Sequence, residues 1–276
     1  MTSDRGAQII EKAKELGATM AGIASVELLK KAPSQQLIRK IGMVVDEAGS
    51  YSVRWQDRFA ETKWPAKARS VLVMAVSHPQ DKPELDAWDP GGSSPGVRML
   101  LRINRELSGW IEETLGIKTH KLPYSVEHGG IFLKEAAVLG GLGCIGRNNL
   151  VITPEFGSRI RLRAMLLEDE LTPTGPIDFD PCKGCEEFCR KACPRNAYEK
   201  NVFSSVETGM DSLPGRDGYF NRANCIFGVI TREGILDEIE EYNHDYDLDI
   251  KEEEPQIKEG IKYCRICEFA CPVGSK

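Results

Sequence analysis

Eight of the nine cysteines lie after residue 180, and seven of these eight form two closely spaced motifs. The first motif reads C-x2-C-x3-C-x3-C-P over residues 182–194, the second reads C-x2-C-x3-C-P over residues 264–272, and Cys225 stands between them. A tight loop of this kind presents several thiolates to one iron–sulfur cube, while the last cysteine of the run reaches another cluster. The eight cysteines therefore predict two 4Fe-4S clusters.

The order of the motifs predicts how the ligands divide. Each cluster is expected to take ligands from both motifs, because the cysteine before each proline reaches across. The first cysteine set is then Cys182, Cys185, Cys189 and Cys271, and the second cysteine set is Cys193, Cys225, Cys264 and Cys267. The usual bacterial run has two residues between its second and third cysteines, whereas this chain has three, residues 186–188, so we expect a local loop adjustment.

Zinc binding and disulfide formation are the two alternative roles for these cysteines. Zinc also binds Cys-x2-Cys pairs, and two zinc sites would use eight cysteines, but a run ending in Cys-Pro is not the spaced two-pair pattern of zinc ribbons. Disulfides fit poorly, because the number of cysteines is odd and nothing in the sequence indicates an oxidising compartment. Zinc stays as the alternative to iron–sulfur clusters.

Charge and hydropathy narrow the functional class. The chain has 276 residues and a net charge of −6, whereas proteins that hold nucleic acid through its phosphates usually show a basic balance. Its longest apolar run, Val71 to Val76, is far below the roughly 20 residues of a membrane span. The N-terminus shows neither an apolar signal region nor a twin-arginine pair. We expect a cytoplasmic protein with no membrane partner, and a solvated acidic face over residues 237–259.

The chain reads as an α+β fold with a domain boundary near residue 175, which separates residues 1–174 from the cysteine-rich residues 175–276. Apolar spacing predicts helices, and short β-branched runs predict strands. Expected helices cover residues 7–16, 97–115 and 130–139, expected strands cover 20–24, 71–76, 149–152 and 158–167, and a loop covers 80–97.

The last of these strands carries Arg159, Arg161 and Arg163 at alternate positions, so that all three point to one side. A solvated sheet edge is the simpler interpretation of this arginine face. An anion-binding face, for example for a phosphate, is the alternative.

Residues 141–146 read G-x-G-x-x-G, which matches the dinucleotide-binding fingerprint letter by letter. That fingerprint must follow a strand and open a helix, but this one follows a helical pattern and leads into a strand. We therefore reject a nicotinamide site. The glycines are expected to let the backbone approach either a packed helix or a flat cofactor, and Cys144 among them is interpreted as a small buried thiol and not as a ninth cluster ligand.

Residues 134–150, KEAAVLGGLGCIGRNNL, followed by PEFGS at 154–158 and the two cysteine motifs, resemble epoxyqueuosine reductase, a cobalamin-dependent enzyme related to the reductive dehalogenases. The resemblance implies an N-terminal domain similar to the nitroreductase-like fold that holds a base-off corrinoid. It also implies a ferredoxin-like C-terminal domain whose two clusters pass single electrons from a donor of the ferredoxin or flavodoxin type to cobalt. Reduction of an electrophilic substrate by Co(I) would follow.

The resemblance also implies site residues. Counting back from the glycine turn places the family's catalytic carboxylate on Glu127, which would supply a proton, with Tyr124 as a neighbouring donor. The corrinoid-contacting residues it implies are Lys134, Gly141, Gly143, Cys144, Gly146 and Arg147.

Two differences between this sequence and the proteins it resembles affect which substrate we expect. The tRNA-modifying enzymes continue into a helical-repeat tail, whereas this sequence stops at Lys276, so we expect a small or nucleoside-like substrate and keep tRNA as an alternative held by the arginine face. Respiratory dehalogenases carry an export signal that is lacking here. A two-cluster electron carrier, or an activator of a separate corrinoid protein, is the alternative from another functional class.

Overall fold

The computed structural model describes residues 4–37, 62–78, 94–124, 126, 129–221, 224–225 and 264–274. Its centre is a four-stranded antiparallel sheet with the strand order β1-β2-β6-β3. The strands are β1 (Met20–Ser25), β2 (Ser70–Ser77), β6 (Ile160–Leu167) and β3 (Thr119–Lys121). The expected mixed helix-and-strand fold is confirmed, and β2 lies inside the sheet as its continuous apolar sequence predicts.

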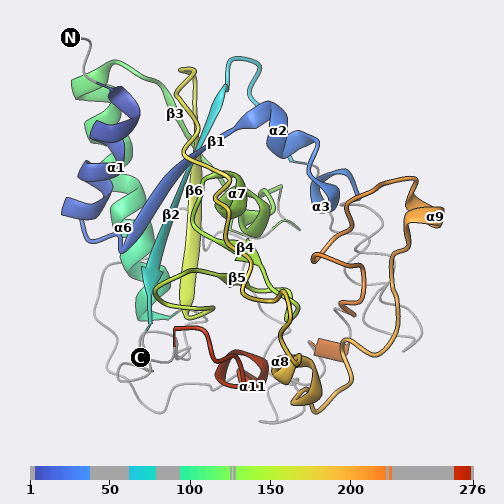
Figure 1. The fold of residues 1–276 in the computed structure, drawn as a ribbon. Helices are drawn as coiled ribbons and strands as arrows, with labels where there is room; N and C mark the ends of the chain where they lie inside the picture. Colours follow the sequence, from blue (N-terminus) through green and yellow to red (C-terminus); the bar gives the residue numbers. More distant parts are fainter. Residues whose placement is uncertain are drawn as a thin grey trace, which may run out of the picture.

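Helices cover both faces of this sheet (Figure 1). On one face, α1 (Arg5–Glu15) and α6 (Pro95–Trp110) pack against alternate β2 residues such as Leu72 and Met74. On the other face, α2 (Val26–Lys30) and α7 (Leu133–Leu139) pack against Val71 and Val73. Because successive strand residues point to opposite faces, one strand joins two apolar cores.

The remaining described elements are short. They are α3 (Pro33–Gln36), η3 (Ile111–Leu115), β4 (Cys144–Ile145), β5 (Val151–Ile152), α8 (Phe188–Lys191), α9 (Ser205–Thr208) and α11 (Ile266–Phe269). Strands β4 and β5 form a two-stranded hairpin below α7. No described helix has the length and apolar character needed to cross a bilayer.

Element boundaries differ from the expected ones for local reasons. Helix α6 begins at Pro95 and not at Val97, because Ser94 caps it through the Val97 N–H at 3.4 Å and proline suits the first helical turn. The expected loop over 80–97 is therefore wrong at its end, and residues 79–93 lie outside the described residues. Strand β5 begins at Val151 and not at Asn149, whose φ of 56° is left-handed.

The arginine strand is not a solvated edge. Strand β6 lies between β2 and β3, and the side chains of Arg159 and Arg163 are only 2% and 3% exposed. Arg163 donates to the Leu122 carbonyl at 3.3 Å. The simpler sequence-based interpretation is therefore wrong for these two residues, while Arg161 is partly buried. Strand β3 pairs only with residues 165–167, so other contacts, such as that of Arg163 with Leu122, cover the arginine face.

Candidate metal centre

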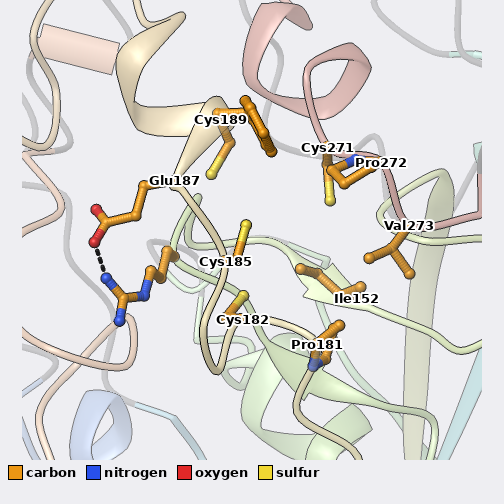
Figure 2. Close-up of a pocket in the computed structure, with 11 residues that line it drawn as sticks. Ile152, Pro181, Cys182, Cys185, Glu187, Cys189, Cys271, Pro272 and Val273 are labelled. Atoms are coloured by element: carbon orange, nitrogen blue, oxygen red, sulfur yellow. Dashed lines mark hydrogen bonds and ion pairs between the residues drawn. The ribbon is translucent and has the colours of Figure 1, made fainter.

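Four cysteines from two distant segments line one cavity, and they are the first cysteine set (Figure 2). Their sulfurs face the same central space. The cavity holds about 360 Å³ of space free of atoms, including the part open to solvent, and Arg147, Ile152 and Glu187 also line it. Helices α8 and α11 contact each other, so the two motifs meet at this point although about 80 residues separate them.

The loop before α8 explains how three of these sulfurs converge. The Cys182 N–H donates to the Asp180 carboxylate at 3.1 Å, and the Cys185 N–H donates to the Cys182 carbonyl at 3.3 Å, which closes a tight turn. Glu187, inside the three-residue spacer, has a φ of 59° and directs the chain into α8. This left-handed residue is the local adjustment that the longer spacer predicted.

Burial raises the pKa of the Cys189 and Cys271 thiols. Backbone N–H groups work in the opposite direction, since that of Arg190 bonds to Cys189 and that of Val273 bonds to Cys271. The positive charge of Arg159 also favours the Cys271 thiolate. Metal binding at this set would therefore release protons, and donors that stabilise the resulting thiolates are already in place.

The second cysteine set gathers around Tyr198. Cys193, Cys225 and Cys267 all act electrostatically on this buried phenol, and Cys264 acts on Cys267. Burial is the main reason that the pKa of Cys267 is raised to about 12, and its hydrogen bond with Tyr198 opposes the rise. The structure thus brings the first cysteine set together around one cavity, and the charges of Cys225 and Cys264 act on Cys267 in the second set. The division of the eight cysteines between two clusters remains a prediction.

The donor set suits a multi-atom cofactor. Among the described residues, no three His, Cys, Asp or Glu side chains are grouped as the ligands of one metal ion. The first cysteine set instead surrounds a cavity. Four thiolates around one cavity fit the ligand set of an iron–sulfur cube.

The glycine turn, residues 140–147, packs against the protein's own backbone. It follows α7, as expected, and so lacks the strand-to-helix order of a dinucleotide site. A Cβ at Gly143 would lie 2.0 Å from the Ile152 carbonyl oxygen, and one at Gly141 would lie 2.6 Å from that of Thr174. A Cβ at Gly146 would lie 2.3 Å from Cδ1 of the Ile152 side chain. Close packing therefore requires glycine at these three positions.

Cys144 lies beside the first cysteine set. It packs with Cys182 and Cys271 around Ile152. Burial is the main cause that raises its pKa to about 11, and the charge of Cys182 adds to this. Its side chain is only partly buried, which differs from the fully buried thiol that was expected.

Two arginines from the cysteine-rich part hold the glycine turn by its carbonyl groups. Arg216 donates to the Ile145 carbonyl at 3.0 Å, and Arg190 donates through Nε to the Arg147 carbonyl at 2.8 Å. Carboxylates fix both guanidinium groups, Asp180 at 2.6 Å from Arg216 and Asp217 at 2.6 Å from Arg190. The turn is therefore clamped to the segment that carries the cysteines.

The next two carbonyls are capped in the same way. Tyr198 donates to the Asn148 carbonyl at 2.8 Å, and Lys134 donates to that of Asn149 at 2.6 Å. Arg147 forms an ion pair with Glu187 at the edge of the cavity. Lys134 and Arg147, expected to contact a corrinoid, thus both have protein partners, and their contact with the cofactor remains a proposal.

The sequence analysis missed Arg190, Tyr198 and Arg216. Their only sequence signal is position, since Arg190 follows Cys189 directly and Tyr198 stands five residues after Cys193. It also missed His78, which is 2% exposed at the end of β2 and lies 2.9 Å from Arg265 of the second motif. Arg265 in turn pairs with Glu268, so this buried group fastens α11 to the sheet.

The proposed acid Glu127 lies outside the described residues. Tyr124, its proposed neighbour, is described and partly buried. The assignment of both as catalytic residues therefore rests on the sequence resemblance alone.

Comparison with known proteins gives a consistent picture. An epoxyqueuosine reductase from Lactococcus garvieae is 25% identical over 214 residues, which cover 74% of this chain and 52% of that protein. A tetrachloroethene reductive dehalogenase from Desulfitobacterium hafniense is 43% identical over 149 residues, 49% of this chain and 25% of that protein. The chain is thus similar to the epoxyqueuosine reductases over about three quarters of its length. No protein-family model matches it.

The fold agrees with this relationship. The solved epoxyqueuosine reductase from Streptococcus thermophilus superposes with a TM-score of 0.61 at 20% identity, over 99% of this chain and 67% of that one. The chain spans about half the length of the curated epoxyqueuosine reductase from L. garvieae. The suspected family resemblance is confirmed, and the fold of the epoxyqueuosine reductases extends over nearly all of this chain.

Proposed function

We propose that this chain is a cobalamin-dependent iron–sulfur reductase that acts on an electrophilic, small or nucleoside-like substrate. The observation that carries the proposal is the convergence of the first cysteine set around one cavity beside the glycine turn. Eight cysteines in two such sets supply the ligands of two 4Fe-4S clusters. The named relatives are all reductases, which supports a redox role.

The protein's own groups would serve the electron path. The first cysteine set adjoins the turn 140–147, since Arg147 lines its cavity, and Cys144 packs with two of its thiols. Electrons entering through the clusters would therefore arrive at this turn. A corrinoid held at this turn would supply a low-valent cobalt centre for the reduction.

Exposure supports some of the proposed corrinoid contacts more than others. Gly143 and Gly146 are buried against Ile152, which leaves the partly exposed Gly141, Cys144 and Arg147 as the candidate contacts of the turn. Lys134, in helix α7 before the turn, stays a candidate contact of the corrinoid. Glu127 is the proposed proton donor, because a carboxylic acid beside an apolar macrocycle loses hydration and stays protonated near neutral pH.

The test of this function is corrinoid uptake. The full chain is reconstituted anaerobically with iron and sulfide, mixed with cobalamin and passed through a desalting column. We expect about one cobalt per chain to stay bound, with the optical spectrum of a base-off corrinoid. Retention of iron without any cobalt would instead support the two-cluster electron carrier.

Replacing Glu127 with Gln is expected to slow substrate turnover by about 10²-fold and to leave corrinoid uptake intact, because the amide keeps the size of the side chain but cannot donate the proton. Reduction of epoxyqueuosine, as the free nucleoside and within tRNA, gives the readout. Tyr124→Phe is the matched comparison at the same loop. Unchanged turnover in Glu127→Gln would remove this residue from the site.

The identity of the substrate can be tested by measuring tRNA binding. A solved epoxyqueuosine reductase similar in fold to this chain, with a TM-score of 0.60 at 19% identity, holds an epoxyqueuosine-modified tRNA stem loop. We propose the free nucleoside or a smaller electrophile for this chain. Binding of the stem loop that weakens steeply with salt would favour tRNA instead.

A further inference from the structure

Residues 215–217, Gly-Arg-Asp, contact both the glycine turn and the loop of the first cysteine motif. The Arg216 guanidinium donates to the Ile145 carbonyl at 3.0 Å through one nitrogen and to the Asp180 carboxylate at 2.6 Å through another. The second oxygen of Asp180 accepts from the Cys182 N–H at 3.1 Å. One continuous chain of polar contacts therefore runs from the backbone of a proposed cluster ligand to the backbone of the turn.

A parallel chain of contacts runs through Asp217. Its two carboxylate oxygens accept from one nitrogen of Arg190, at 2.8 and 2.6 Å, and Nε of Arg190 donates to the Arg147 carbonyl at 2.8 Å. Arg190 directly follows Cys189, another proposed ligand. Adjacent residues of one segment thus link the turn to two members of the first cysteine set.

The backbone of this segment has a conformation that side chains rarely adopt. Arg216 has a φ of 88°, in the left-handed region, which is unfavourable for a residue with a Cβ and persists only where the surrounding contacts hold it. Glycine would fit this φ without strain. The presence of arginine therefore points to a role for its side chain.

A cluster at the first cysteine set would fix the cysteine ends of both chains of contacts. Ligation holds the four cysteines in one arrangement, and with them the Cys182 N–H and the residue that follows Cys189. Without iron, only weak contacts support Asp180 and Arg190. The order of the turn should therefore depend on whether the set is occupied.

We propose that Arg216 is a positioning residue that couples the first cysteine set to the glycine turn, so that a cluster bound at this set holds the turn in the arrangement that receives the corrinoid. The proposal rests on the proposed function for both cofactors and adds the residue that connects their sites. Because coupling is reciprocal, a corrinoid bound at the turn must also stabilise the cluster. Arg216 acts through the backbone of the turn and takes no part in the chemistry of the substrate.

The test is amide hydrogen exchange of residues 140–150, followed by mass spectrometry with and without iron reconstitution and before any cobalamin is added. Iron is expected to slow exchange of this segment roughly tenfold in the unmodified protein and to have little effect in Arg216→Met. Arg5→Met is the matched control, because Arg5 of α1 also pairs with an aspartate, Asp169 at 2.9 Å, and it should behave like the unmodified protein.

Cobalamin binding is the second readout. In the iron-loaded chain, Arg216→Met is expected to raise the dissociation constant of cobalamin roughly tenfold. Added cobalamin should slow the removal of iron by a chelator in the unmodified protein and not in Arg216→Met. A lower melting temperature of Arg216→Met with the iron dependence of exchange preserved would show a merely structural role and contradict the proposal.

Equal exchange of residues 140–150 with and without iron in the unmodified protein would overturn the proposal, and this comparison needs no variant. If Arg216→Met does not fold, Arg216→Gly takes its place, since glycine suits the φ of 88°. Failure of the unmodified protein to bind iron or cobalamin would instead overturn the proposed function.

Discussion

Replacing Cys271 with Ala removes one of the two proposed clusters, which is about four of about eight iron atoms per chain. The reason is that Cys271, although it belongs to the second motif, lines the cavity of Cys182, Cys185 and Cys189 in the first. Cys189→Ala should therefore remove the same cluster. Cys267→Ala should remove the other one, since the charges of Cys225 and Cys264 act on Cys267 more strongly than that of Cys189.

Iron content and electron paramagnetic resonance spectra of the reduced variants make this comparison. The spectrum left in Cys271→Ala is expected to match the one left in Cys189→Ala and to differ from that of Cys267→Ala. Cys144→Ala is the control, because this cysteine packs beside the cavity but is not among the proposed ligands, and it should retain all of the iron. If Cys271→Ala and Cys267→Ala lose the same cluster, the proposed division of ligands is wrong.

Replacing Gly143 with Ala is expected to lower the free energy of unfolding by about 3 kcal/mol, or roughly 5–10 °C in melting temperature. The new Cβ would lie 2.0 Å from the Ile152 carbonyl oxygen and 3.1 Å from the Thr153 Cα, both of them backbone atoms that cannot rotate away. The hairpin of β4 and β5 must then open. Because this hairpin borders the first cysteine set through Ile152, loss of iron should accompany the loss of stability.

Gly109→Ala is the matched control for this variant. Gly109 lies within α6, where a Cβ would meet no atom within 4 Å, so the same substitution there should stabilise the protein by about 0.5–1 kcal/mol. Thermal unfolding monitored by circular dichroism measures both variants. A melting temperature of Gly143→Ala equal to that of the unmodified protein would show that the turn is not packed as described.

The cysteine motifs predicted which residues would meet, because ligand spacing and the prolines depend on local chemistry that the sequence carries. The apolar pattern likewise placed β2 inside the sheet. The arginine strand was placed wrongly, since alternation shows which residues share a face but not whether the rest of the protein covers that face, as it does at Arg159 and Arg163.

The clamp on the glycine turn could not be predicted. Arg190, Tyr198 and Arg216 donate to backbone carbonyls, which every residue possesses, so no sequence pattern marks the acceptor. The glycines themselves were ambiguous for a similar reason. A glycine in the sequence indicates that another group approaches the backbone but does not identify that group. The structure shows that Ile152 and Thr174 are the residues that approach it here.

The most direct test of the whole account is a Mössbauer spectrum of the chain reconstituted with ⁵⁷Fe, together with metal analysis of the protein as purified without oxygen. The account predicts about eight iron atoms per chain, all in 4Fe-4S clusters, and no stoichiometric zinc. Two zinc ions per chain with almost no iron would contradict it.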